Sequence, residues 1–408
     1  MGAGVKPSLG WTLLSKDALK RAEKQLREDV EGVRDEVGFL GLHQAYADRF
    51  FPGTSVLHTR LRYALFVPWL YQRLIERAER HRIDELLERE ERTLVSRLRL
   101  SGELGIIGSR SYPKPTTQPP SLVYWTALGT WRILKPLPAG TCPPRATVHR
   151  ALALMSAGHR LHDDDHQPLD EAVQIFSALP SPPPGWNDSR LPLNFSLGPA
   201  EERFLRGCLL TVHRPGTTGI PSLLARVVDV PLTASTDLYG VKVTSAADPE
   251  DRAALRRAGQ AAALSAVGRA VYAALVEWMQ DRFDGAPKST HHRDMLPDVI
   301  ATYRNDALAL DVEAVETDAP GRITNGILTV LAETQVWLRR QGRNVEDLHP
   351  VYEQAEFCRK GRRSRLTKTP AGRERRAEWI PEEHPDASPL HYRWDNVRRL
   401  LMDLQGTP

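Results

Sequence analysis

The stretch Tyr46–Tyr71, YADRFFPGTSVLHTRLRYALFVPWLY, constrains the fold of this chain more than any other. An aromatic pair and a Pro-Gly turn precede a run whose leucines and tryptophan recur at helical spacing, which predicts a buried helix over about residues 56–80. Arg60, Arg62 and Tyr63 stand within that run. Because an unpaired guanidinium is costly in an apolar environment, we expect carboxylates, backbone carbonyls or a ligand to hold these side chains.

Composition places the 408-residue chain among soluble globular proteins, with 41% hydrophobic and 26% charged residues. The net charge of +4 is compatible with nucleic acid but does not indicate it. Cys142, Cys208 and Cys358 lie far apart, which argues against a disulfide framework and a structural zinc site. No stretch reaches the roughly 18 apolar residues of a membrane span, and no signal peptide is visible. We expect a cytoplasmic protein without membrane contact.

Hydrophobic periodicity predicts a mainly α-helical fold with little β structure, in which only Asp237–Val243 alternates like a strand. A Pro-rich segment at residues 179–199 predicts a linker between two helical lobes, residues 1–178 and 200–408. The helices are predicted near residues 15–26, 33–50, 83–100, 121–134, 147–156, 199–212, 221–228, 249–283, 295–316 and 323–341.

Two histidine-containing segments could carry chemistry. The first, HRLHDDDHQPLD at residues 159–170, has five consecutive metal-ligand types at residues 162–166, but consecutive side chains point in different directions, which favours a solvated turn. The second, His291-His292 before a predicted helix at Met295, is either ordinary helix-start chemistry or a catalytic pair. The sequence contains no phosphate-binding loop, nucleophile elbow, metalloprotease, kinase or dinucleotide motif. We therefore predict no metal and no cofactor, and these patterns identify no catalytic residue.

A Glu/Arg-rich helix, a loop and the helix after Pro119-Pro120 resemble the end of a helix-turn-helix, whose second helix presents its N-terminal residues to base edges. Ser121, Tyr124 and Thr126 would then read bases, and Arg110 and Lys114 would contact phosphates. The loop is longer than the usual turn, and the tryptophans equally suit a structural helix. Both interpretations stay open.

The densest positive charge lies at residues 359–376, RKGRRSRLTKTPAGRERR, which hold nine Lys or Arg and one Glu. Such a run suits phosphate contacts or an acidic partner, and a solvated loop is the alternative. The nine cations are Arg359, Lys360, Arg362, Arg363, Arg365, Lys368, Arg373, Arg375 and Arg376. We name residues 359–376 the basic segment.

Four stretches together, FFPGTSVLHTRLRYALFVPWLY, GIIGSR, PPSLVYWTALGTWRIL and PLHYRWDNVRRLLMDL, resemble one bacterial family, a domain of unknown function about as long as this chain. That family is often encoded in phage-defence islands beside helicases and nucleases. The resemblance covers most of the chain, and its first stretch is the most specific. It implies a helical cytoplasmic protein in antiviral defence and supplies no activity and no catalytic residues.

We therefore expect a non-enzymatic subunit of an anti-phage system. Its partner would be DNA, or a helicase or nuclease through protein–protein interaction. The alternative is an enzyme, a metal-dependent nuclease or other hydrolase, with ligands dispersed along the chain. Convergence of several carboxylates or histidines in one place would favour the enzyme, and a continuous basic surface would favour the binding protein.

Overall fold

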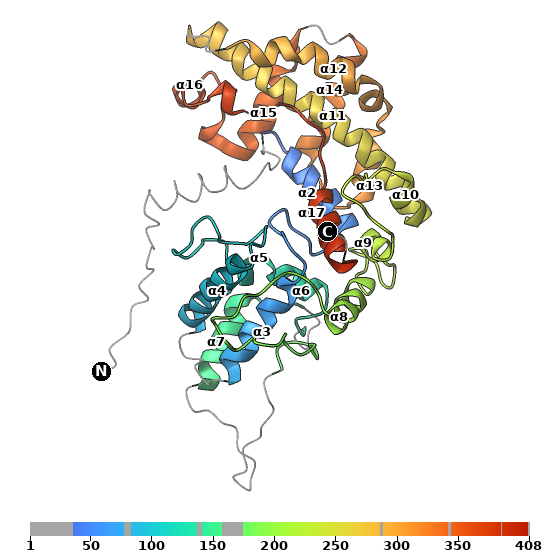
Figure 1. The fold of residues 1–408 in the computed structure, drawn as a ribbon. Coiled ribbons are helices and arrows are strands. Elements are labelled where there is room, and N and C mark those ends of the chain that lie inside the picture. The colour runs from blue at the N-terminus through green and yellow to red at the C-terminus, as the bar shows by residue number, and fades with distance from the viewer. Residues whose placement is uncertain are drawn as a thin grey trace, which may run out of the picture. The chain divides into compact units, whose positions relative to one another are not determined.

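The computed structural model describes residues 36–76, 83–136, 141–156, 174–285, 289–341, 344–384 and 386–406. Every regular element in these ranges is helical, so the prediction of a mainly α fold is confirmed (Figure 1). Extended pairing there is limited to two isolated bridges, Leu134 with Phe176 and His213 with Pro221. Residues 33–408 group into one compact unit. The predicted helix at residues 15–26 and the segment 159–170 lie outside the described residues.

The helices of the described residues come in the following order along the chain. The first six are α2 (Phe39–Phe50), α3 (Tyr63–Glu76), α4 (Ile83–Leu100), α5 (Pro120–Val123), α6 (Trp125–Thr130) and α7 (Arg145–Ser156). The next five are α8 (Pro199–Leu210), α9 (Leu223–Val227), α10 (Val241–Ala246), α11 (Pro249–Met279) and α12 (His291–Ala309). The last five are α13 (Val312–Asp318), α14 (Asn325–Arg339), α15 (His349–Lys360), α16 (Pro370–Ala377) and α17 (Trp394–Leu404). Four shorter helical turns are η1 (Gln280–Asp284), η2 (Val345–Leu348), η3 (Gly361–Arg363) and η4 (Pro381–Glu383).

Helix α11 is the longest, at 31 residues, and α2, α12, α13 and α14 all contact it. Asp248 caps its N-terminus by accepting from the backbone N–H of Asp251 at 2.8 Å. Small residues let neighbours approach closely: a Cβ at Gly268 would lie 2.5 Å from Phe39 and 3.0 Å from the Tyr352 hydroxyl. Helix and turn together, Pro249–Asp284, are long and apolar enough to cross a membrane, but 89% of the apolar window is buried within the protein. The apolar surface of this helix therefore packs inside the hydrophobic core of the protein.

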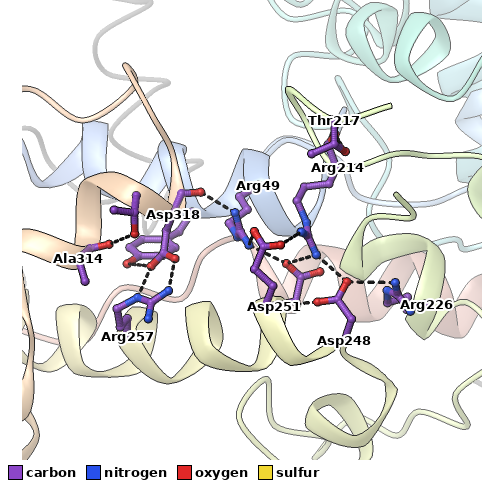
Figure 2. A network of polar contacts seen from close by, with 12 residues as sticks. Arg49, Arg214, Thr217, Arg226, Asp248, Asp251, Arg257, Ala314 and Asp318 are labelled. Atoms are coloured by element: carbon purple, nitrogen blue, oxygen red, sulfur yellow. Dashed lines mark hydrogen bonds and ion pairs between the residues drawn. The ribbon is translucent and has the colours of Figure 1, made fainter. Parts of the chain in front are cut away.

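A network of buried ion pairs joins α2, α11, α13 and the loop after α8 (Figure 2). Arg49 and Arg214 each approach Asp251 Oδ1 at 3.1 Å. Arg49 also donates to the Asp318 carbonyl at 2.7 Å, and Arg257 Nε donates to Asp318 Oδ2 at 2.8 Å. Removing one partner of such a pair leaves an uncompensated buried charge, which costs about 3–5 kcal/mol. The network therefore fixes the relative placement of these elements.

Two predictions about local structure are wrong. The helix predicted from about residue 56 begins at Tyr63, because the side chains of Thr54 and Ser55 close turns ahead of it. Thr54 Oγ1 donates to the Phe51 carbonyl at 2.7 Å, and Ser55 Oγ accepts from the Leu57 N–H at 3.2 Å. The strand predicted at 237–243 is a turn followed by α10, whose first residue, Val241, is exposed.

The Pro-rich segment 179–199 packs against α3 and α4. Trp69 of α3 donates its indole N–H to the Pro180 carbonyl at 3.0 Å, and Trp186 is buried. The buried guanidinium of Arg97 in α4 donates at 2.7–2.8 Å to three carbonyls, those of Gly185, Trp186 and Leu191. The division into two lobes at this segment stays a prediction, and the segment itself is anchored to the region that precedes it.

Candidate nucleic-acid interface

The basic segment comprises the last two residues of α15, η3, an irregular stretch and most of α16. The buried carboxylate of Glu356 organises it by accepting from the hydroxyls of Tyr272 at 2.6 Å and Ser364 at 2.7 Å. The same group accepts from the backbone N–H groups of Arg365 at 2.8 Å and Leu366 at 2.9 Å. Burial opposes the charged form, but Lys360 and the donors outweigh it and lower the pKa of the Glu356 carboxyl. These contacts hold the segment to the rest of the fold.

Three of the nine cations serve the fold itself. Arg376 is buried, pairs with Asp284 and donates from Nη1 to the Thr367 carbonyl at 2.7 Å. Lys360 Nζ lies 2.9 Å from Glu356 Oε1. Arg365 is partly buried, and the neighbouring Tyr272 and Glu356 raise the pKa of its guanidinium, although burial opposes the shift. The guanidinium of Arg376 is buried and paired with Asp284, so it cannot contact a phosphate. The phosphate contact predicted for Arg376 is therefore wrong.

The other six cations are exposed: Arg359, Arg362, Arg363, Lys368, Arg373 and Arg375. Their neighbours include exposed aromatic rings. Lys368 Nζ lies 4.7 Å from the ring centroid of Phe283, which is exposed in η1, and Phe357 is exposed in α15. Proteins that bind single-stranded nucleic acid combine such cations, which contact the backbone, with rings on which bases stack. Arg375 also forms an exposed pair with Glu378, at 2.7 Å, of the kind that contributes little to stability.

The base-reading role is wrong for two of its three predicted residues, Ser121 and Tyr124, whereas Thr126 is exposed and its role stays a prediction. Ser121 is buried, and its backbone N–H donates to Glu91 Oε1 at 2.8 Å. Tyr124 is buried, and its hydroxyl donates to the Arg60 carbonyl at 2.7 Å. Neither side chain is available at the surface, so neither can read a base edge. Trp125 and Trp131 are buried too, in line with the structural interpretation of this helix.

Arg110 and Lys114 are exposed in the loop between α4 and α5. That loop is held to α3, where the Tyr63 hydroxyl accepts from the Ile107 N–H at 2.9 Å. The basic segment is held separately, by Glu356 and Asp284. The phosphate role predicted for these two cations stays a prediction, independent of the one for the basic segment.

The two arginines before α3 are engaged inside the protein. Arg62 is buried, with Nη2 at 2.7 Å from Glu201 Oε1 and Nη1 donating to the Asn194 carbonyl at 2.9 Å. Arg60 is partly exposed and its Nε donates to Asp403 Oδ1 in α17 at 3.0 Å. Carboxylates and carbonyls thus hold both guanidinium groups, as an apolar setting requires.

A polar pocket of about 190 Å³ lies between α4, the following loop and α7. Lys114 and Arg145 line it, together with the buried carboxyl of Glu91, whose pKa is raised by burial to about 7. Asp84, also on the wall, accepts from the ring of His149 at 2.7 Å if Nδ1 carries the proton. A carboxyl that titrates near neutrality can give or take a proton. The sequence contains a signal for this pocket: Asp84, Glu88 and Glu91 recur at helical spacing and so lie along one face of α4.

The histidine pair opens α12, four residues earlier than the predicted helix start. Glu277 of α11 accepts from the backbone N–H groups of His292 at 3.1 Å and Arg293 at 2.8 Å. The Thr290 hydroxyl donates to Asp294 Oδ2 at 2.7 Å. The N-terminus of α12 is thus stabilised by contacts that do not involve the imidazole rings of His291 and His292. Both rings can therefore make other contacts.

A protein-family model matches more than half of the chain. The description "Family of unknown function (DUF6361)" applies to residues 9–294, a span that ends early in α12 and before the basic segment. No curated protein and no solved structure matches the chain.

Proposed function

Because the chain belongs to the DUF6361 family, from which no activity can be carried over, we propose a function on geometry alone: it binds nucleic acid along the basic segment. The observation that carries this proposal is the division of the nine cations into three that anchor the segment and six that remain exposed. An anchored backbone presents its charged side chains at lower entropic cost than a free loop would.

The proposed binding is insensitive to base sequence. The cations are flexible Arg and Lys side chains beside exposed rings, a combination that contacts phosphates and stacks on any base. In the anti-phage setting that the sequence resemblance implies, such a subunit would hold nucleic acid for a helicase or nuclease partner. Bacterial origin, cytoplasmic location and that partner are part of this proposal.

The test is a salt titration of affinity for a single-stranded and a duplex oligonucleotide. Each phosphate contact contributes about 0.9 to the slope of log affinity against log salt on duplex DNA and about 0.7 on single strands. Replacing Arg359, Arg362, Arg363 and Arg373 by Glu should therefore flatten the slope by about 3.6 on duplex DNA and about 2.8 on single strands, since four contacts are lost.

The matched control reverses four exposed arginines outside the basic segment: Arg150, Arg203, Arg256 and Arg340. It changes the net charge by the same amount, so an effect of overall charge would flatten both slopes equally. Unequal slopes support the proposal. Equal slopes, or binding by neither the parent nor the control, would reject it.

A second candidate function, a hydrolase, is favoured by the pocket beside α4. Glu91 offers a carboxyl that titrates near neutrality, and Arg145 and Lys114 offer positive charge in the same wall. We would measure hydrolysis of the bound nucleic acid, with and without Mg²⁺, for the parent, Glu91→Gln and Glu88→Gln. Activity lost only in Glu91→Gln supports this function, and activity equal in all three proteins, or absent from the parent, argues against it.

A further inference from the structure

We propose that His291, His292 and Asp386 form a binding site for one divalent transition-metal ion. Each residue offers one ligand atom, and the three atoms lie within 4.8 Å of one another. The ligands come from two separate elements: the histidines open α12, and Asp386 follows η4, 95 residues after His291. Metal sites in proteins commonly take their ligands from distant parts of the chain. The consecutive residues 162–166 do not have this arrangement, whereas His291 and Asp386 do. This inference does not depend on nucleic-acid binding.

The hydrogen bonds around His292 prepare it as a ligand. Its Nε2 lies 3.2 Å from the Pro381 carbonyl, which can only accept, so Nε2 carries the proton. The proton assignment follows from that partner. Nδ1 is then left with a lone pair. Metal-bound histidines commonly donate their other ring N–H to a backbone carbonyl in this way, which fixes the tautomer and the ring orientation.

His291 and Asp386 already meet without an ion. His291 Nε2 lies 3.2 Å from Asp386 Oδ1, and the rings of His291 and His292 are 5.0 Å apart. A tetrahedral ion with bonds of about 2.0–2.2 Å holds its donor atoms roughly 3.4 Å apart, so the set must contract slightly. The side chains of His291 and Asp386 are 51% and 75% exposed, which leaves them free to make that adjustment.

The surroundings suit an ion with one open position. A cavity of about 20 Å³ adjoins the ligands, enough for one water molecule, and His292, Asp386 and Met295 line it. Arg269 also lines this cavity, and its positive charge is offset by Glu36, 4.0 Å away. Two neutral imidazoles, one carboxylate and a water form a set that Zn²⁺ accepts. Binding would clamp the start of α12 to the segment after η4.

The experiment is calorimetric titration of the full chain, without a histidine tag, with ZnCl₂ at pH 7.5. We expect one Zn²⁺ per chain. His291→Ala and Asp386→Ala should each weaken binding at least tenfold while keeping the thermal melting temperature of the metal-free parent, because both side chains are exposed. Zn²⁺ should raise the melting temperature of the parent and not of these variants, since a ligand that binds only the folded state stabilises it.

The matched control is the double variant His162→Ala/His166→Ala, which removes the other histidine-acid cluster of the sequence. It should bind Zn²⁺ as the parent does. The proposal is overturned if His291→Ala and Asp386→Ala bind as tightly as the parent. It is also overturned if the loss appears only in the control, or if the parent takes up no Zn²⁺.

Discussion

Arg376 and Asp284 form a bidentate ion pair: Nε donates to Oδ2 at 2.7 Å and Nη2 donates to Oδ1 at 2.8 Å. The two side chains are 1% and 10% exposed, although Arg376 belongs to the most basic stretch of the sequence. The pair ties α16 to η1 at the end of α11. One cation of the basic segment therefore anchors the backbone from which its exposed neighbours extend.

Replacing Arg376 with Ala should destabilise the protein by about 3–5 kcal/mol, because Asp284 would keep a largely buried and unpaired charge. Arg375→Ala, one residue earlier, should cost only about 0–1 kcal/mol, since its pair with Glu378 is exposed. Urea unfolding of both variants and the parent measures the difference. Similar losses for Arg375→Ala and Arg376→Ala would contradict the structural role.

Arg62 should behave as one half of a buried pair. Arg62→Ala is expected to cost about 3–5 kcal/mol because Glu201 is left charged and buried. Adding Glu201→Gln to that variant should recover part of the loss, since the uncompensated charge disappears. A double-mutant cycle measured by chemical denaturation gives the coupling energy. Purely additive losses would show that the two side chains do not stabilise each other.

Stability should fall as the pH rises through neutrality on account of Glu91. Its carboxyl has a pKa raised by burial to about 7, above its ordinary value of 4.5, so the folded protein binds its proton more tightly. The resulting stabilisation is complete below pH 4.5 and is lost as the pH rises through about 7. Glu91→Gln, which resembles the protonated acid, should lack this dependence.

We would measure the free energy of unfolding of the parent and of Glu91→Gln between pH 5 and pH 8. The advantage of the variant over the parent should grow with pH. Subtracting the two curves cancels the other titrating groups, among them His58, whose pKa burial lowers to about 4. A difference that does not change with pH would mean that Glu91 titrates at its ordinary pKa.

Arg97 should protect the Pro-rich segment from proteolysis. The side chain of Arg190 is 87% exposed, but Arg97 holds the carbonyl of Leu191 just after the trypsin-sensitive bond. We expect slow cleavage after Arg190 in the parent and faster cleavage in Arg97→Ala. Arg99→Ala, an exposed neighbour on the same helix, is the control. Mass spectrometry of the fragments separates this local effect from general unfolding, which would add cleavage at many sites.

Local periodicity was sufficient to predict the long helices. The bounds predicted for α4, residues 83–100, are those of the structure, because its leucine stripe and Glu/Arg face follow a period of 3.6 over five turns. Periodicity misled where turns compete with helices. The leucines of residues 56–62 fit a helix, yet the side chains of Thr54 and Ser55 close turns there. The alternating apolar and polar residues at 237–243 resemble a strand, yet they form a turn and the first residues of α10.

The candidate sites depended far more on tertiary contacts. The charge density of the basic segment is a property of the sequence, but nothing local distinguishes Arg376, which is buried against Asp284, from Arg375, which is exposed. Likewise the histidine pair was visible, and its meeting with Asp386 was not. Periodicity and composition act over a few residues and determined the helical class and the place of the charges. Which side chains are buried, paired or brought together was decided by packing between parts of the chain that can be 343 residues apart, which short-range patterns do not encode.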